Sequence, residues 1–227
     1  MNEEYPMDTH LKGYADKYAE WRKSGSFTFS SRIIPVQESF TSTQWVLPQE
    51  QVLKLLREVR SIALTDCICR THYHRCDRPR DVCLLLDELA DKTVASGKAL
   101  KISMDEVSER LREADRYGLI HMALYMPGHK IYALCSCCAC CCHDLQLLLQ
   151  YHRVDLVARS DYVADTDSSR CNSCELCIER CVFGARKVQD GVFVYDPRSC
   201  LGCGLCVSVC PENATGMKKR DIEDPGY

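Results

Sequence analysis

Two cysteine runs near the end of the chain repeat one spacing, and that spacing could hold metal. Each run reads C-x2-C-x2-C-x3-C, and the second continues with Pro211. The cysteines are Cys171, Cys174, Cys177, Cys181, Cys200, Cys203, Cys206 and Cys210. The runs begin at positions 171 and 200, 29 residues apart, which indicates an internal duplication. A tight loop with cysteines at steps of three presents three thiolates to one iron–sulfur cluster, whereas tetrahedral zinc sites use paired cysteines.

These runs resemble the bacterial ferredoxin with two 4Fe-4S clusters, over about residues 160–218. The resemblance implies that the last cysteine of each run ligates the other cluster. One cluster would be held by Cys171, Cys174, Cys177 and Cys210, and the other by Cys200, Cys203, Cys206 and Cys181. The second loop contains Gly202 and Gly204, which let backbone approach a cluster closely, whereas the first has no glycine. Glu175 also adds a negative charge to the first loop, and Val182 replaces the proline expected after Cys181, so we expect the first cluster to differ in potential.

Ten further cysteines lie between residues 67 and 142, six of them in the stretch CSCCACCCH at 135–143. Neighbouring side chains in a strand or helix point apart, so these six thiols cannot all face one cluster. The stretch contains two interleaved C-x2-C pairs, and each pair could point one way. With the four upstream cysteines they make eight thiols: Cys67, Cys69, Cys76, Cys83, Cys137, Cys138, Cys140 and Cys141. We expect one or two extra iron–sulfur clusters there, with Cys135 and Cys142 spare or outside the ligand set.

The N-terminal pattern also resembles a class of cysteine-rich iron–sulfur proteins of anaerobes, over about residues 32–218. The resemblance rests on CICR, CSCCACCC, RIIPV and ISMDEVSERLREADRYGLIH. The resemblance implies electron transfer to or from low-potential enzymes, but it does not indicate which reaction is served.

Other chemistries of the ten thiols stay open. A structural zinc site could use Cys67, Cys76, Cys83 and one later thiol. Vicinal cysteines could instead form a thiol–disulfide or redox-sensing centre, or remain inert and buried. His143 could act as a ligand, although it is better explained as the start of the next helix.

The loop THYHRCDRPR carries the basic groups nearest the upstream cysteines. His72 and His74 flank Arg70 and Arg75 and are expected to be solvated. The alternative is that this basic loop donates hydrogen bonds to cluster sulfurs.

The elements that must position these thiols predict an α+β protein. Helical patterns with caps or apolar stripes cover residues 9–23, 48–63, 81–96, 103–118 and the stretch LQLLLQYHRVDLV. β-Hairpins are expected over 119–134 and between the two runs, and the tail after Pro211 is expected to fray. We therefore expect a mostly helical, cysteine-rich metal domain over residues 1–158 and a small ferredoxin-like domain over residues 159–227.

Composition narrows the class of protein. Cysteine makes up 18 of 227 residues, yet the chain is longer than the small secreted disulfide scaffolds and shows no export signal, so metal explains the thiols better. A net charge of −3 disfavours nucleic-acid binding, and no run approaches the length of a membrane span. We expect a cytoplasmic protein.

The function expected from these observations is transfer of single low-potential electrons between a donor and an acceptor redox protein in an anaerobic pathway. The chain would be an electron carrier or an oxidoreductase subunit, and no catalytic residue is assigned. One alternative is a reductase whose N-terminal cluster acts on a substrate, with His121, His129 and His143 as its obvious acid–base groups. The other is a redox-sensing or zinc-stabilised regulator.

Overall fold

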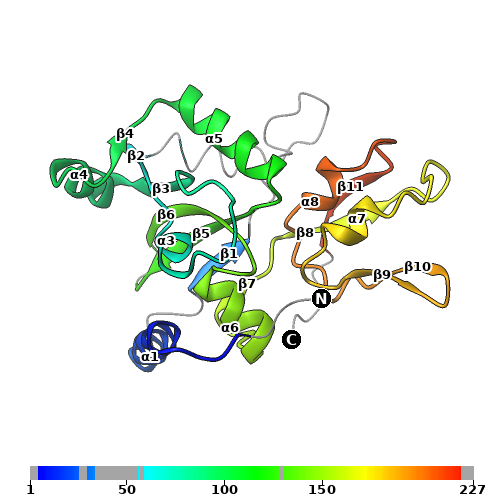
Figure 1. Cartoon of the computed structure of the whole chain (residues 1–227), viewed down its shortest axis with the longest axis horizontal. Coiled ribbons are helices and arrows are strands. Elements are labelled where there is room, and N and C mark those ends of the chain that lie inside the picture. Colours follow the sequence, from blue (N-terminus) through cyan, green and yellow to red (C-terminus); the bar gives the residue numbers. More distant parts are fainter. Residues whose placement is uncertain (1–4, 26–29, 34–55, 57–58, 128–129, 221–227) are drawn as a thin grey trace.

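The computed structural model describes residues 5–25, 30–33, 56, 59–127 and 130–220 (Figure 1). Within this part the chain contains both helices and sheets, so the α+β class is confirmed. The expectation of a mostly helical N-terminal half is wrong, because a seven-stranded sheet forms its centre.

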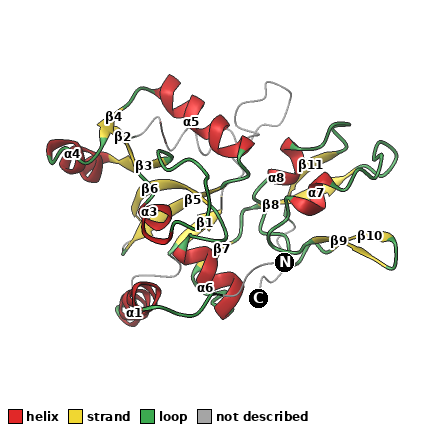
Figure 2. Cartoon of the chain, viewed as in Figure 1, coloured by secondary structure: helices red, strands yellow, loops and turns green. Residues whose placement is uncertain are grey.

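This sheet has the strand order β4-β2-β3-β6-β5-β1-β7. The strands are β1 (Ser31–Ile33), β2 (Ile62–Thr65), β3 (Cys83–Leu86), β4 (Leu100–Lys101), β5 (Ile120–Met126), β6 (Lys130–Cys137) and β7 (Val157–Ala158). Neighbours are antiparallel except β1 and β7, which are parallel. In the view of Figure 2 the helices α1 and α6 lie below these strands and α5 lies above them.

Two expected helices are strands where they meet the sheet. Most of the helix expected over 48–63 lies outside the described residues, Leu56 is helical, and residues 62–65 form β2. Residues 83–86, expected as a first helical turn, form β3, and only Asp87–Ala95 form the helix α4. The apolar run VCLLL fits a strand buried between β2 and β6, and this packing outweighs the capping signal at Asp81.

Two other expected helices form as the sequence indicates. The helix α1 (Thr9–Lys23) begins at Asp8, whose carboxylate accepts from the Leu11 N–H, and it buries Leu11 and Tyr18. The helix α5 (Met104–Arg116) has the expected capping box of Ser103 and Glu106.

The cysteine stretch lies where the sheet passes into a helix. The strand β6 runs through Cys137, a turn covers 138–142, and α6 (His143–Tyr151) follows. Within the turn the N–H of Cys142 donates to the carbonyl of Cys138 at 3.0 Å. The short helix α3 (Ile68–Tyr73) holds Cys69, and the loop after it holds Cys76. Thiols on different strands and loops can therefore face one another.

The remaining elements form two small sheets beside the seven-stranded one (Figure 1). They are β8 (Tyr162–Thr166) with β11 (Thr215–Lys219), β9 (Arg186–Gln189) with β10 (Val192–Tyr195), and the helical turns α7 (Leu176–Glu179) and α8 (Leu205–Ser208). The expected hairpin turn is confirmed, because Asp190 and Gly191 both have positive φ. The tail does not fray throughout, since residues 215–219 pair with β8.

One hydrophobic core joins the two halves of the chain. Leu201 and Leu205, from the second ferredoxin-type loop, are 2% exposed and pack in the same cluster as Leu145 and Leu148 of α6. That cluster also contains Cys137 and Cys142. The second loop is therefore attached directly to the body that carries the N-terminal thiols.

Candidate metal centres

The structure brings the ferredoxin-type cysteines together in two sets. Four of them line one cavity of about 100 Å³, and we call them the outer set: Cys171, Cys174, Cys177 and Cys210. Cys171 and Cys174 are exposed. The Ala214 N–H donates to Cys210 Sγ at 3.2 Å, and such backbone hydrogen bonds outweigh burial and lower the pKa of Cys210. Backbone donors that stabilise a thiolate fit the ligand environment of an iron–sulfur cluster.

The other four form the inner set, in which Cys203 packs against the core that contains α6 and the others pack with β8 and β11: Cys181, Cys200, Cys203 and Cys206. Cys200 and Cys206 are buried, and burial raises the pKa of Cys206 to about 12 although Arg186 opposes it. Arg186 lies between the sets, because its guanidinium donates to Cys177 Sγ at 3.6 Å and also lowers the pKa of Cys206. The grouping places Cys181 with the second run and Cys210 with the first.

Position 202 requires glycine because of close packing within the protein, which is a different reason from the expected close approach of its backbone to a cluster. It adopts φ +78°, and a Cβ there would collide with the carbonyl oxygen of Tyr162 and lie 2.7 Å from Ser160 Cβ. The loop of the inner set is thus pressed against the start of β8.

We expect Gly202→Ala to destabilise this loop more than a positive φ alone would. Gly184 is the matched control, because it has φ +65° and a Cβ at that position would meet nothing within 4 Å. Both substitutions introduce backbone strain of about 1–2 kcal/mol, and Gly202→Ala adds overpacking of about 1–3 kcal/mol. Chemical unfolding of both variants measures the difference, and equal stabilities would contradict the close packing.

The ten N-terminal thiols also meet in space, and they divide into two groups. The four-thiol set has all its Sγ atoms within 4.8 Å of one another and consists of Cys76, Cys138, Cys140 and Cys141. The six-thiol set consists of thiols that are close enough to shift one another's pKa: Cys67, Cys69, Cys83, Cys135, Cys137 and Cys142.

This division differs from the interleaved pairs expected from spacing. Cys138 and Cys141 lie together as expected, whereas Cys137 lies with Cys142 and apart from Cys140. Cys135 and Cys142, expected to be spare, lie beside Cys83 and Cys69 and raise the pKa of these two thiols. One sequence feature could have grouped Cys135 with Cys137. Cys135 precedes Cys137 by two residues on β6, which places both on one face of the strand.

The neighbours of Cys67 in the six-thiol set favour a thiolate there. The adjacent thiols of Cys69 and Cys83, with Arg70 nearby, lower the pKa of Cys67 to about 3 against the effect of burial. His143 begins α6 as expected and is buried, which lowers its pKa and keeps the imidazole neutral. Its Nδ1 lies 3.1 Å from Cys69 Sγ, and its Nε2 lies 2.9 Å from the Tyr18 hydroxyl.

Arginines of α3 and the following loop reach cysteine sulfurs of the four-thiol set. Arg70 is 1% exposed, and its guanidinium donates to Cys138 Sγ at 3.5 Å and to the Ser136 carbonyl at 3.0 Å. Arg78 donates to Cys140 Sγ at 3.7 Å. His72 and His74 are exposed, as expected, although His72 belongs to α3 and stacks on His10.

The groups expected to serve acid–base chemistry are placed differently. His129 lies outside the described residues. His121 is buried on β5, and its Nδ1 lies 3.0 Å from Ser136 Oγ. Burial lowers the pKa of His121 to about 4, which keeps the side chain neutral at pH 7.

This shift predicts that acid weakens the fold through His121. In the unfolded chain the histidine pKa is about 6.5, so below that pH the unfolded state binds a proton that the folded state does not. The free energy of unfolding should therefore fall by about 2 kcal/mol from pH 7 to pH 5 through this residue. Urea unfolding of His121→Asn should show a shallower pH dependence than the wild type. Parallel dependences in the two proteins would contradict this assignment.

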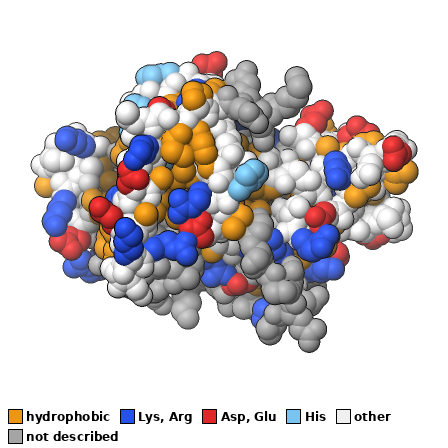
Figure 3. Space-filling view, turned by 90° about the horizontal axis from the view of Figure 1, so that it is seen from below, with side chains coloured by type: hydrophobic (Ala, Val, Ile, Leu, Met, Phe, Trp, Pro, Cys, Tyr) orange, Lys and Arg blue, Asp and Glu red, His pale blue; other side chains and the backbone are white. Residues whose placement is uncertain are grey.

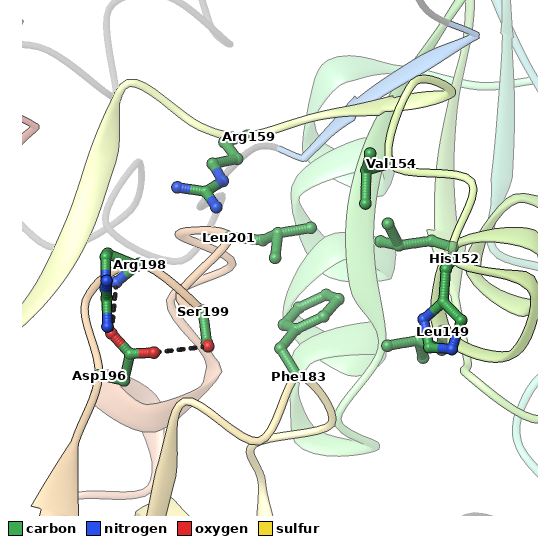
Figure 4. Close-up of a pocket in the computed structure, with 10 residues that line it drawn as sticks. Leu149, His152, Val154, Arg159, Phe183, Asp196, Arg198, Ser199 and Leu201 are labelled. Atoms are coloured by element: carbon green, nitrogen blue, oxygen red, sulfur yellow. Dashed lines mark hydrogen bonds and ion pairs between the residues drawn. The ribbon is translucent and has the colours of Figure 1, made fainter. Parts of the chain in front are cut away.

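Two cavities border the centres. One of about 510 Å³ is lined by Cys76, Cys138 and Cys140 with Arg75, and it extends to Val182 beside the inner set. The other, of about 500 Å³, lies between α6 and the second run (Figure 4). There Phe183 and Leu201 face Leu149 and His152, and no cysteine is among its described lining residues. The first cavity therefore places the four-thiol set close to the ferredoxin-type half.

The cysteine sets and the comparisons together support an iron–sulfur module of the ferredoxin type in this chain. Residues 193–214 match the family of 4Fe-4S binding domains. A tetrathionate reductase subunit of Archaeoglobus fulgidus is 29% identical over 110 residues, which is 46% of this chain and 50% of that protein. The chain thus spans half the length of this relative.

Two further relatives match shorter stretches. A subunit of an ion-translocating oxidoreductase complex of Methanosarcina acetivorans is 33% identical over 48 residues, 21% of this chain and 18% of that protein. An archaeal-type glutamate synthase [NADPH] of Dehalococcoides mccartyi is 30% identical over 66 residues, 28% of this chain and 13% of that protein. Two of the three relatives are named as subunits of larger oxidoreductases.

The surface carries charges of both signs. Figure 3 views the face with α1 and α6, where Lys and Arg side chains alternate with hydrophobic ones, while several acidic side chains gather at the far end of the ferredoxin-type half. Glu175 and Glu179 are exposed beside the outer set. Within the described ranges, no helix is both long and apolar enough to cross a membrane.

Proposed function

We propose that the chain transfers single low-potential electrons between a donor and an acceptor redox protein, as a carrier or as an oxidoreductase subunit in an anaerobic, cytoplasmic pathway. The observation that carries this proposal is the order of the thiol sets. Cys171 and Cys174 of the outer set are exposed, and Cys203 of the inner set packs against the core that also contains Cys137 and Cys142 of the six-thiol set. Such a series suits passage of electrons through the chain.

The proposal assigns one 4Fe-4S cluster to the outer set and one to the inner set, which is the crossed arrangement. A 4Fe-4S cluster, when bound, accepts and donates one electron at a time. The donors fit this group, because each set supplies four sulfurs and Arg186 and the Ala214 N–H hydrogen-bond to cysteine sulfurs of the outer set. Different exposure and charge around the two sets support different potentials.

The six-thiol set is assigned an extra iron–sulfur cluster. It offers more than the four thiolates that a cluster needs, and all its members except half-buried Cys135 are buried. The neutral His143 beside Cys69 and the guanidinium of Arg70 would orient and stabilise those thiolates. This assignment extends the expected division into a metal domain over 1–158 and a ferredoxin domain over 159–227.

The exposed outer set is the proposed contact point for a partner. Glu175 and Glu179 lie beside it, and ligation by thiolates adds negative charge, so the partner surface should be basic. Leu176, 42% exposed between these residues, supplies an apolar contact. A docking surface of this kind gives fast association that weakens with salt.

The test is anaerobic electron transfer from the reduced chain to cytochrome c, a basic one-electron acceptor. We expect reduction whose rate falls as ionic strength rises, and a several-fold lower rate for Glu175→Lys at low salt. Asp91→Lys is the matched control, because Asp91 is equally exposed on α4, away from the outer set. Absence of electron transfer would refute the proposed function, and equal rates for both variants would refute the proposed contact point.

A further inference from the structure

The four-thiol set has the dimensions of a site for one metal ion. Its four Sγ atoms all lie within 4.8 Å of one another. Cys76 Sγ lies 3.8 Å from Cys138 Sγ, and Cys140 Sγ lies 3.8 Å from Cys141 Sγ. Four sulfurs at about 2.3 Å from a tetrahedral zinc ion are about 3.8 Å apart. A 4Fe-4S cluster binds each thiolate to a different iron around a cage of metal and sulfide, which requires a wider spacing.

Charge around the set also suits a single divalent ion. Four thiolates and one divalent cation carry a net charge of −2. The guanidinium of Arg70 donates to Cys138 Sγ and that of Arg78 donates to Cys140 Sγ, so two positive charges compensate it. Hydrogen bonds to the sulfurs from such outer groups are typical of thiolate metal sites.

The position of the set in the fold suits a structural clamp. Cys76 belongs to the loop between α3 and β3, whereas the other three belong to the turn between β6 and α6. Arg75 of the same loop donates to the Cys140 carbonyl in the turn and to the Gln146 side chain in α6. An ion bound by all four sulfurs would fix a loop that otherwise connects to the turn through a few hydrogen bonds.

We propose that Cys76, Cys138, Cys140 and Cys141 bind one zinc ion, separate from the iron–sulfur centres. Binding leaves all four cysteines as thiolates and releases the protons that their thiols still hold, with no change of oxidation state. Tetrahedral sites of four sulfurs select zinc among redox-inert divalent ions, and closed sites of this kind contribute directly to folding. The ion would hold the α3–β3 loop against the β6–α6 turn and leave the six-thiol set as the N-terminal redox centre.

The test is anaerobic quantification of zinc, iron and inorganic sulfide in the full chain and in two variants. We expect about one zinc per wild-type chain, because a single mononuclear site is proposed. Cys140→Ser should lose zinc at least ten-fold more readily to a chelator, with sulfide per chain unchanged. Cys203→Ser is the matched control and should lose iron and sulfide while it retains zinc. The proposal would be overturned if Cys140→Ser contained less sulfide per chain than the wild type. It would also be overturned if Cys140→Ser lost zinc to the chelator no more readily than the wild type.

X-ray absorption at the zinc edge of the wild type keeps the test independent of how the variants fold. The proposal predicts four sulfur neighbours at about 2.3 Å with no neighbouring metal. Nitrogen or oxygen ligands would identify the zinc as adventitious and would overturn the proposal. Wild-type protein that contains no zinc would also overturn the proposal. This measurement depends neither on iron nor on electron transfer. A result that overturns the zinc site therefore leaves the proposed electron-transfer function to be tested separately.

Discussion

Cys203→Ser should remove one 4Fe-4S cluster from the chain and leave the other intact. The loss should amount to four irons and four sulfides, the content of one such cluster, and to one EPR signal of the reduced protein. Cys203 belongs to the inner set, where it lies close to Cys206, Cys200 and Cys181. A serine hydroxyl is a poor substitute for a thiolate, so a three-cysteine set should not retain a full cluster.

The crossed assignment makes this prediction more specific. Cys181→Ser should abolish the same EPR signal as Cys203→Ser, although Cys181 belongs to the first run in sequence. Cys210→Ser should instead match Cys174→Ser, because both lie in the outer set. If Cys181→Ser removed the signal that Cys174→Ser removes, the ligands would not be crossed.

Arg70→Met should destabilise the N-terminal half by about 3–5 kcal/mol, the cost of removing one partner of a buried ion pair. Arg70 is almost fully buried, and its charge faces Cys67 and Cys138. Thiol donors and Arg70 together lower the pKa of Cys138 below its ordinary value, so removal of the guanidinium leaves buried negative charge without compensation. Chemical unfolding of the metal-loaded chain measures the loss.

Two controls separate charge from geometry in this prediction. Arg80→Met removes an exposed arginine that donates to His74, and it should change stability by less than about 1 kcal/mol. Arg70→Lys keeps the charge but cannot reach both Cys138 Sγ and the Ser136 carbonyl, so it should restore only part of the stability. Equal stability of Arg70→Met and Arg80→Met would show that Arg70 does not compensate the thiolates.

The ferredoxin-type half was predictable because its signals are local. The cysteine spacing fixes the loops, and Asp190–Gly191 specifies the turn between β9 and β10. The strand β11 was missed, because its polar sequence forms a strand only through pairing with β8.

One element of the N-terminal half was also predictable from a local signal. The capping box of Ser103 and Glu106 alone placed α5 correctly.

The N-terminal half was harder because its thiols are grouped by non-local pairing. Cys83 was expected on a helix, but the position of β3 between β2 and β6 places it opposite Thr65 and within reach of Cys135. Periodicity predicts that neighbouring cysteines in a strand or helix diverge, but Cys140 and Cys141 lie in a turn, where their sulfurs are 3.8 Å apart. It also does not show which upstream thiol each cysteine meets. That depends on strand order, which the sequence pattern does not specify.

The central claim is that the chain carries single electrons on 4Fe-4S clusters, and an anaerobic reductive titration tests it most directly. The metal-loaded chain is titrated with a one-electron reductant while visible absorbance and EPR spins are recorded, and then it is reoxidised. We predict uptake of at least two electrons per chain, one for each ferredoxin-type cluster, with reversible bleaching. A chain that contains eight irons but takes up fewer than two electrons, or does not recover on reoxidation, would contradict the account.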